Sequence, residues 1–440
     1  MLNRDTPLYD AGLVSIEASG WRTTQASPAD YPPLQEDQET DVLVVGAGLA
    51  GASLALHLAE AGVNVAILEA RQPGWGASGR NAGHVLPLLK NLEVFKNFAD
   101  GGRAFLEQFR EHHQLPFTLS TRLGIDCDAA PVGYLHALRS KRAFTRFSHQ
   151  AEGQAQQLGQ RVQRLGGDEM HRLTGTRAYP YGVLHDAGGR INPYQFTLGL
   201  VASVRQLGAS VFGNSEALAL SRAGQRWRVE TAKASILCDR VVFCTNAYAT
   251  DIVPELARCY YPLTAYALTT KPLPVELREI IMPGRAVLAQ APVDLNPLVV
   301  DGHHRLITAS IPSGRHPADA AWHFRHHLRW LRRTWPETQS AGIELEHYWT
   351  GRVALRDQEF PGIYEVQPGV YGLMHFNAWG NVMAPLLGML LAQALVEDRL
   401  DRLPFPIGRP QAVKYSGRQS LLIRRFLIPA ARIAQTLGAI

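Results

Sequence analysis

The sequence predicts an α/β fold built on a parallel sheet, and three observations carry this prediction. The chain first runs through a strand, a glycine-rich turn, a helix and a second strand at residues 41–70. A buried apolar strand follows much later, at residues 241–244. A strand, a turn and a helix at residues 369–396 form a last unit, which we expect to close the sheet beside the first strand.

The first strand and its turn indicate the type of ligand. Val42–Val45 is a continuous apolar run, as expected for a strand buried on both faces. Gly46, Gly48 and Gly51 follow at G-x-G-x-x-G spacing. In this motif the first glycine permits a sharp turn, the second lets a pyrophosphate approach the backbone, and the third lets the helix pack on the strand. The helix N-terminus adds free N–H groups for phosphates. The pattern predicts a Rossmann-like, dinucleotide-binding domain.

An acid at the end of the second strand narrows the choice of dinucleotide. Glu69 stands where a carboxylate can accept both ribose hydroxyls of an adenosine. A carboxylate there repels a 2′-phosphate, so NADP is the least expected ligand. The motif alone leaves NAD and FAD open.

Composition excludes several classes of protein. The 440 residues suffice for two or three domains, and 46% hydrophobic content is typical of a globular chain. The formal charge of +5 is modest and no nucleic-acid-binding motif occurs, so no nucleic acid partner is expected. The four cysteines form no C-x-x-C pair, which favours a reducing, cytoplasmic compartment. We find neither a signal-peptide pattern nor an uncharged apolar run of about 18 residues.

The remaining elements follow in order along the chain. Residues 1–40 are polar and proline-containing and are expected to form an extended arm, and residues 71–83 form a loop rich in Gly, Ser and Asn. Further strands are expected within residues 124–138, 211–221, 225–231, 241–244, 260–270 and 369–374, and helices at 95–113, 143–158, 194–207, 321–335 and 382–396.

The loop after the first unit resembles that of a known superfamily. GWGASGRNAGHV at residues 74–85 resembles the second flavin loop of FAD-dependent enzymes of the D-amino-acid oxidase type. Within this superfamily the chain is similar above all to the gamma-glutamylputrescine oxidases, through GRINPYQFTLGL at 189–200, VVFCTNAY at 241–248 and WTG at 349–351. The resemblance spans about Asp41 to about Pro406. Its motifs are specific for the superfamily and not for the substrate.

The resemblance implies a Rossmann-like FAD-binding domain interleaved with an α+β substrate domain built on an antiparallel sheet. The expected segments are an N-terminal arm at 1–40, the FAD-binding domain at 41–93, 152–249 and 346–403, the substrate domain at 94–151 and 250–345, and a C-terminal tail at 404–440.

The resemblance also implies contacts to an extended FAD. Glu69 and Arg71 would lie at the adenosine, and Leu218 would pack on the adenine through its backbone. The helix that starts near Trp379 would point its dipole at the N1–O2 edge of the flavin, where reduction places negative charge. The expected cofactor-binding residues are Gly46, Gly48, Gly51, Glu69, Arg71, Trp75, Gly76, Ser78, Arg80, Asn81, Gly83, His84, Leu218, Thr245, Asn246, Trp379, Gly380, Asn381, Val382 and Met383.

Two departures from the superfamily pattern bear on the substrate. Amino-acid dehydrogenases often carry an arginine two residues after the WTG glycine, where it pairs with the substrate carboxylate, and this chain has Val353 there. Arg352 and Arg356 are the alternative cations, although strand alternation turns Arg352 away from the face of Val353. His84 replaces the glutamine of the similar oxidases. Aromatic walls would suit an amine. The expected substrate-binding residues are His84, Tyr260, Tyr266, Arg352 and Trp379.

These features predict an FAD-dependent oxidoreductase that oxidises the C–N bond of an amine, such as a gamma-glutamylated polyamine, to an imine that hydrolyses to an aldehyde. Hydride passes to flavin N5, and O2 is the expected acceptor. FAD is expected to be held non-covalently, and no catalytic acid or base is assigned. The alternatives are a D-amino-acid or N-substituted amino-acid dehydrogenase that passes electrons to a quinone or another electron carrier, and a non-catalytic flavoprotein subunit.

Two basic clusters leave alternatives open. His323, His326 and His327 fall on one helical turn among arginines, and we interpret them as a solvated face rather than a metal site, so no metal is expected. The tail from Lys414 mixes arginines with apolar residues. It is expected either to close over the protein or to lie on an anionic membrane as a peripheral contact. Because proline interrupts helices, Pro429 indicates that the tail does not form one long amphipathic helix.

Overall fold

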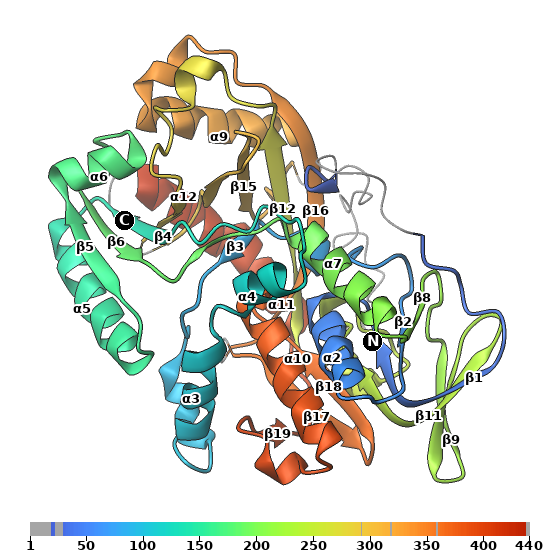
Figure 1. The fold of residues 1–440 in the computed structure, drawn as a ribbon. Helices are drawn as coiled ribbons and strands as arrows, with labels where there is room; N and C mark the ends of the chain where they lie inside the picture. Colours follow the sequence, from blue (N-terminus) through green and yellow to red (C-terminus); the bar gives the residue numbers. More distant parts are fainter. Residues whose placement is uncertain (1–18, 23–29, 292, 317–318, 358–359, 437–440) are drawn as a thin grey trace.

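The computed structural model describes residues 19–22, 30–291, 293–316, 319–357 and 360–436. The described chain forms two lobes, each built on its own sheet (Figure 1). Most of the expected N-terminal arm lies outside the described residues.

The first lobe contains a nine-stranded sheet in the order β19–β17–β18–β11–β1–β2–β8, with the hairpin of β9 and β10 attached to β11. β1 pairs in parallel with β2 and β11, and β18 pairs in parallel with β11. The strands are β1 (Gln38–Val45), β2 (Val65–Leu68), β8 (Ser210–Phe212), β9 (Ala219–Ala223), β10 (Arg226–Glu230), β11 (Ser235–Phe243), β17 (Gly362–Gln367), β18 (Val370–Met374) and β19 (Ile407–Gly408).

The order of this sheet confirms the predicted α/β class and corrects one detail. The last unit does join the sheet, but β11 lies between β18 and the first strand. The valines of β11 are buried on both faces, as a central strand of a parallel sheet requires.

The second lobe contains an eight-stranded, mainly antiparallel sheet in the order β16–β12–β15–β14–β13–β4–β6–β5. A separate pair of short strands, β3 (His84–Val85) and β7 (Gly189–Arg190), accompanies it. The strands of the large sheet are β4 (Tyr134–Leu138), β5 (Val162–Gly166), β6 (Tyr181–His185), β12 (Tyr261–Thr270), β13 (Val287–Gln290), β14 (Leu298–Val300), β15 (Leu306–Ser310) and β16 (Leu345–Leu355).

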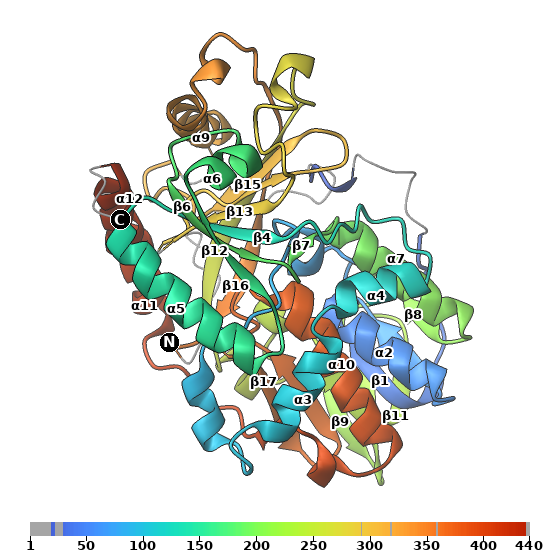
Figure 2. The ribbon, with the colours of Figure 1, turned by 60° about the vertical axis from the view of Figure 1, so that its left-hand side comes forward.

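Helices cover both sheets (Figure 2). Two of them, α2 and α10, pack closely on each other. A Cβ at Gly388 of α10 would lie only 2.8 Å from the carbonyl oxygen of Ala50 in α2, so glycine at this position permits the close approach. The helices are α2 (Leu49–Glu60), α3 (Arg103–His112), α4 (Leu115–Arg122), α5 (Lys141–Gln157), α6 (Gly167–Thr174), α7 (Pro193–Gln206), α8 (Pro254–Ala257), α9 (Ala320–Thr334), α10 (Gly380–Val396), α11 (Ser416–Leu422) and α12 (Ile428–Thr436).

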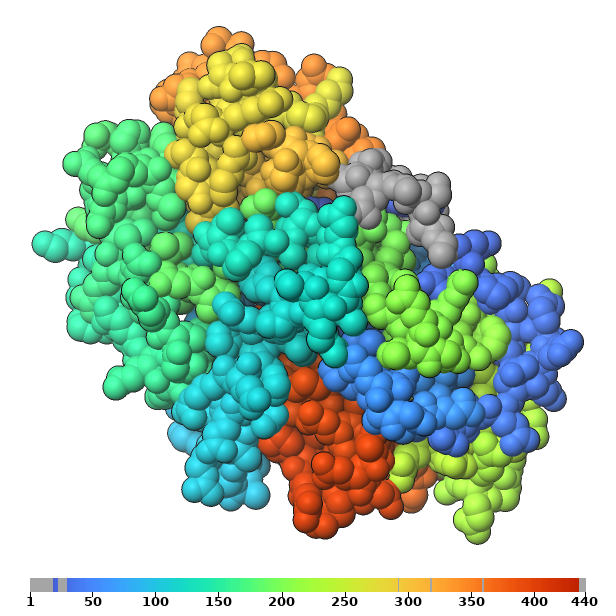
Figure 3. Space-filling model, in the orientation of Figure 1, coloured from blue at the N-terminus to red at the C-terminus, as the bar shows by residue number. Residues whose placement is uncertain are grey.

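Three strands and two helices belong to the other lobe than the sequence indicated. β5 and β6 were expected with the cofactor domain, as was β16, but all three are strands of the second sheet. α3 and α4 were expected with the substrate domain, but their apolar faces bury Phe105, Phe109 and Leu119 in the core of the first lobe. On one face, the turquoise segment that contains α4 covers the junction between the lobes (Figure 3). The apolar pattern of a helix identifies which face is buried, but it does not identify the sheet or helix against which that face packs.

The tail is helical without a break. α11 continues through a π-helical turn, Ile423–Leu427, into α12. The expectation that Pro429 ends the helix is wrong, because the wide turn before it accommodates the proline ring and its missing N–H group. The Ser420 hydroxyl donates to the carbonyl of Pro262 at 2.6 Å, so one side of the tail packs on β12. Within the described residues, no helix is both long and apolar enough to cross a membrane.

Candidate active site

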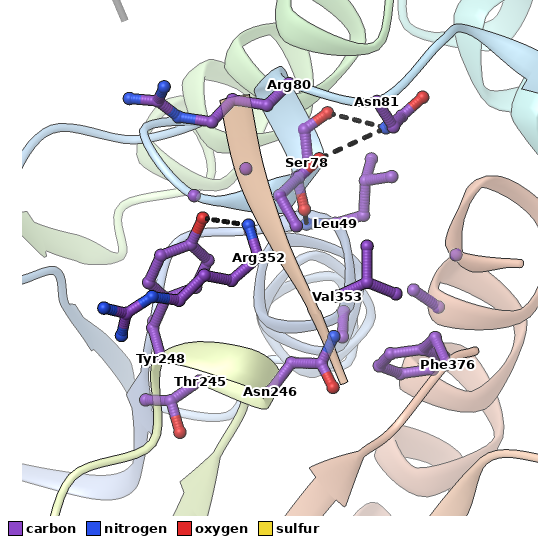
Figure 4. A pocket seen from close by; sticks show the side chains of 18 of the residues that line it. Leu49, Ser78, Arg80, Asn81, Thr245, Asn246, Tyr248, Arg352, Val353 and Phe376 are labelled. Atoms are coloured by element: carbon purple, nitrogen blue, oxygen red, sulfur yellow. Dashed lines mark hydrogen bonds between the residues drawn. The ribbon is translucent and has the colours of Figure 1, made fainter. Parts of the chain in front are cut away.

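A cavity of about 810 Å³ lies between the two lobes. On one side it is bordered by Val45, Leu68 and Phe243, the last residues of β1, β2 and β11. On the other side it is bordered by Ala267 of β12 and Ala309 of β15. Ligands of open α/β sheets bind at the carboxyl ends of the strands, and small-molecule sites have volumes of roughly 300–1,000 Å³. This cavity is therefore the candidate active site (Figure 4).

The glycine turn forms one end of the cavity. Gly46 has a φ of +108°, which side-chain-bearing residues rarely adopt. A Cβ at Gly51 would overlap the carbonyl oxygen of Gly46, so the third glycine is what lets the helix approach the turn. A Cβ at Gly48 would lie 2.8 Å from the hydroxyl oxygen of Ser78, which accepts the N–H of Leu49 at 2.9 Å. The start of α2 thus presents backbone N–H groups next to the Ser78 hydroxyl, which fits a pyrophosphate.

The Glu69 carboxylate is fixed by the backbone around it. Oε2 accepts the N–H of Ala47 at 2.8 Å, and Oε1 accepts the N–H of Arg71 at 2.9 Å. Burial raises the pKa of Glu69, and these two amide bonds act against that rise. Each oxygen keeps a further lone pair, so the carboxylate fits the hydroxyl groups of a ribose.

One arginine and an aromatic pair line the middle of the cavity. The guanidinium of Arg80 lies 4.9 Å from the centre of the Trp75 ring, and the Tyr248 ring meets Trp75 edge-on at 5.4 Å. Arg80 Nε donates to the carbonyl of Trp75 at 2.7 Å, and its Nη1 donates to the carbonyl of Thr350 at 3.0 Å. Arg80 therefore ties loop 74–85 to β16 of the second lobe.

Two asparagines 300 positions apart join the loop to the last helix. Asn81 Nδ2 donates to Asn381 Oδ1 at 3.1 Å, and Asn381 Nδ2 donates back to Asn81 Oδ1 at 3.0 Å. Asn381 Nδ2 also donates to the carbonyl of His84 at 2.8 Å, and Trp379 Nε1 donates to the carbonyl of Leu86 at 3.0 Å. The N-terminus of α10 is thereby held against the loop, as the flavin-binding arrangement requires.

His84 offers a polar atom to a ligand. Its Nδ1 lies 3.3 Å from the hydroxyl of Tyr134, and the two rings meet edge-on at 5.5 Å. Burial lowers the pKa of His84 to about 4, so the imidazole is neutral near pH 7. Its Nε2 is buried and has no hydrogen-bond partner among the described residues. A buried polar atom without a partner on a cavity wall fits a polar group of a bound molecule.

The cations near Val353 are arranged as the strand pattern indicated. Arg352 and Val353 point to opposite sides of β16 (Figure 4), and both border the cavity. Arg356 does not border it, because its Nη1 donates to the hydroxyl of Tyr364 at 2.8 Å. Val353 thus presents an apolar side chain to the cavity.

The expected tyrosine wall is not formed. Tyr260 is buried in the core of the first lobe and does not border the cavity. Tyr266 borders it, but its hydroxyl lies 2.7 Å from His327 Nε2 of α9, on the side of the sheet away from the first lobe. Its neighbours Ala265 and Ala267 complete this part of the wall with small side chains. Both faces of β12 are buried, so strand alternation alone did not identify the face toward the cavity.

Most of the expected cofactor residues are brought together. Those that border the cavity are Gly46, Gly48, Glu69, Arg71, Trp75, Gly76, Ser78, Arg80, Asn81, His84, Thr245, Asn246, Trp379, Gly380, Asn381 and Val382.

Four expected residues do not border it. Gly51 lies beneath the turn, and Gly83, with a φ of +76°, shapes the loop behind the wall. Met383 is fully buried in the core of the first lobe. Leu218 is 54% exposed and does not border the cavity, whereas the residues at 215–217 do, so the expected adenine contact at Leu218 stays a prediction.

Tyr134 and Asp294 are among the wall residues that were not identified from the sequence. Tyr134 lies on β4, where its alternation with His136 indicated only a strand. Asp294 lies between β13 and β14, where its carboxyl accepts the backbone N–H groups of Gln290 and Asn296. An aspartate in a segment between two prolines is typical of an ordinary loop, so the sequence does not indicate that Asp294 lies on the cavity wall.

The histidine cluster is not a solvated face. His323 and His327 are buried, and His323 Nε2 accepts the N–H of Ser313 at 3.0 Å while His327 bonds Tyr266. Among the residues the structure describes, no three His, Cys, Asp or Glu side chains are grouped so that they could hold a metal ion.

Comparison with known proteins agrees with this geometry. Residues 41–394 match the model of a family described as FAD dependent oxidoreductase, DAO. The chain is 28% identical over 403 residues to the gamma-glutamylputrescine oxidoreductase of Escherichia coli, covering 88% of this chain and 93% of that protein.

Two solved structures share the fold. The L-proline dehydrogenase of P. horikoshii superposes with a TM-score of 0.68 at 19% identity, covering 84% of this chain and 96% of that chain. The glycine oxidase of Bacillus cereus superposes with a TM-score of 0.65 at 20% identity, covering 82% and 95%.

Proposed function

The chain belongs to the DAO family of FAD-dependent oxidoreductases, and from this premise we propose that it oxidises the C–N bond of an amine that carries no α-carboxylate. The observation that carries the proposal is the apolar Val353 on the cavity wall, in a strand whose neighbour Arg356 is bonded to Tyr364. The name of the gamma-glutamylputrescine oxidoreductase supports a primary amine of the putrescine type.

The proposed reaction is a two-electron oxidation of the amine followed by hydrolysis. A neutral R–CH2–NH2 group loses a hydride from carbon and a proton from nitrogen and becomes an imine, which water converts to an aldehyde and ammonia. FAD held in the cavity would supply the two-electron acceptor for this oxidation, and its reoxidation by O2 would give hydrogen peroxide. The protein binds and orients the amine, excludes water and stabilises developing negative charge at the N-terminus of α10.

The residues on the wall have separate parts in this proposal. The turn at Gly46 and Gly48 and the start of α2 bind the pyrophosphate, and Glu69 binds the ribose. Loop 74–85, which is held by the bonds of Arg80 and Asn81, would contact the flavin. Neutral His84 serves as a hydrogen-bonding group at the reacting end and not as a cation.

A second candidate is an amino-acid dehydrogenase that passes electrons to a quinone. Lys90 and Arg352 favour it, because both cations border the cavity and could pair with a carboxylate. The Nζ of Lys90 donates to the carbonyl of Asn377 at 2.7 Å, which occupies one of its donors.

The experiment compares substrates on the purified holoenzyme. We expect a higher kcat/KM for 1,4-diaminobutane and its gamma-glutamyl derivative than for D-alanine, with one peroxide formed per turnover in air. A preference for D-alanine would contradict the amine proposal. Turnover with a quinone analogue but without peroxide would favour the dehydrogenase.

We also propose that the helical tail rests on an anionic membrane surface. Tyr415, Leu422, Phe426 and Ile433 are each more than half exposed and recur at helical spacing along its outer side. Residues 402–440 contain several Lys and Arg and no Asp or Glu. Two such tails would repel each other, whereas anionic lipid complements an apolar and basic surface.

A further inference from the structure

Asp294 is held in a fixed position on the cavity wall. Gln290 donates its backbone N–H to Asp294 Oδ1 at 3.1 Å, and the backbone N–H of Asn296 donates to the same carboxyl. The side-chain amide of Gln290 donates through Nε2 to the hydroxyl of Tyr179 at 2.5 Å, so the loop is anchored to the core of the second lobe. Asp294 is exposed in the structure and borders the cavity, so its accessible surface is available to a bound molecule.

Among the described residues, no cationic side chain compensates this carboxyl. Burial raises the pKa of Asp294 to about 7, and of the described groups only the two backbone amides act in the other direction. Its charge in turn contributes to raising the pKa of Tyr134, which burial also raises. Two of the cations on the cavity wall bond backbone carbonyls, since Arg80 bonds two of them and Lys90 bonds a third. A carboxylate that faces the cavity without a countercharge would gain an ion pair from a cationic ligand, which would also shield it from water.

The surrounding wall fits an alkyl chain that ends in an ammonium group. Pro297, Ala267 and Ala309 border the cavity with small apolar side chains, and Tyr134 adds an aromatic ring. An alkyl chain packs on such surfaces, while an ammonium group gains a charge-assisted bond to a carboxylate.

We propose that Asp294 binds a second ammonium group of the substrate, one that does not react, so that the enzyme prefers diamines and related dications to monoamines. This inference rests on the proposed amine oxidation. The reacting nitrogen has to be neutral before its C–H bond can release hydride, and a carboxylate beside it would hold it as ammonium. An ion pair with Asp294 therefore suits the distant nitrogen of a chain with two amines.

The test compares 1,4-diaminobutane with butylamine, which lacks only the second nitrogen, on the wild-type holoenzyme and on Asp294→Asn. The amide keeps the oxygen that accepts the N–H of Gln290 and loses the charge. We expect the ratio of kcat/KM for diamine over monoamine to fall by about 10- to 100-fold, the range for a bond to a charged group. Butylamine should change by less than about 2-fold, and Asp294→Glu should recover part of the ratio. Asp168→Asn, an exposed acid of the same lobe, is the matched control and should leave the ratio unchanged.

Each outcome decides the proposal. An unchanged ratio in Asp294→Asn overturns it, and so does an equal loss for both amines, which would place Asp294 at the reacting nitrogen or in a purely structural part. If the wild type turns over no amine, the proposed function fails, and binding then decides the inference. Titration of the holoenzyme, followed through the flavin absorbance, should still show tighter binding of diamine than of butylamine, and equal binding would overturn the inference. Flavin content and Tm of Asp294→Asn establish that the variant is folded, and if it is not, Asp294→Glu against wild type supplies the comparison of ratios.

Discussion

Replacing Gly51 with alanine tests the glycine turn most sharply. A Cβ at this position would overlap the carbonyl oxygen of Gly46 and would lie 3.0 Å from Val44 Cγ1 and 3.3 Å from Cys244 Cβ. Two of these atoms belong to the buried side chains of Val44 in β1 and of Cys244 just after β11, and the third belongs to the turn backbone, so none can move freely. Forcing a methyl group into such a packed site costs about 1–3 kcal/mol. The turn or the start of α2 has to shift away, and both belong to the proposed pyrophosphate site.

A shift of that energy lowers FAD affinity by roughly 5- to 150-fold, since 1.4 kcal/mol corresponds to tenfold. The assay is titration of the apoprotein with FAD, followed by quenching of flavin fluorescence. Gly153→Ala is the matched control, because a Cβ there meets nothing within 4 Å, and alanine is favourable in the interior of α5. The reasoning would be refuted if Gly51→Ala bound FAD as tightly as the control does.

Three further predictions concern the cofactor, pH and the tail. Acid precipitation should release FAD into a yellow supernatant, because the only histidine in loop 74–85, His84, is expected to bond the ligand without attachment; flavin in a wild-type pellet but not in a His84→Ala pellet would contradict this. The diamine-to-butylamine ratio of kcat/KM should rise between pH 6 and pH 8, because Asp294, with a pKa of about 7, is increasingly ionised over that range, and a ratio independent of pH would refute the role of its charge. The protein should sediment with phosphatidylglycerol vesicles at low salt but not with phosphatidylcholine vesicles, and Phe426→Ser with Arg425→Glu should abolish this; equal sedimentation of the double variant would exclude the tail as the contact.

Local chemistry at the cofactor end was readable from the sequence. The turn needs glycine because a Cβ at residue 46, 48 or 51 would meet backbone or the Ser78 hydroxyl. The three glycines in the sequence therefore predict the turn directly. Glu69 follows because the end of the second strand adjoins the turn through short-range pairing of β1 with β2. The resemblance of loop 74–85 then indicated a flavin, and the family match confirms it.

The substrate end depended on tertiary structure. Tyr134 comes from β4 and Asp294 from the loop between β13 and β14, and their sequences differ in no way from those of an ordinary core tyrosine and an ordinary loop acid. Tyr266 has the alternation of a wall residue, yet both faces of its strand are buried, so only packing against α9 decided where its hydroxyl lies. The pairing of Asn81 with Asn381 likewise joins residues 300 positions apart.

The sequence by itself therefore determined the class of fold and the geometry of the phosphate turn, because both follow from backbone sterics over a few neighbouring residues. Only the tertiary structure decided which side chains meet across the cavity and which lobe each helix joins. Those contacts arise between surfaces that are equally apolar in sequence, and their choice depends on how whole elements pack rather than on any single residue.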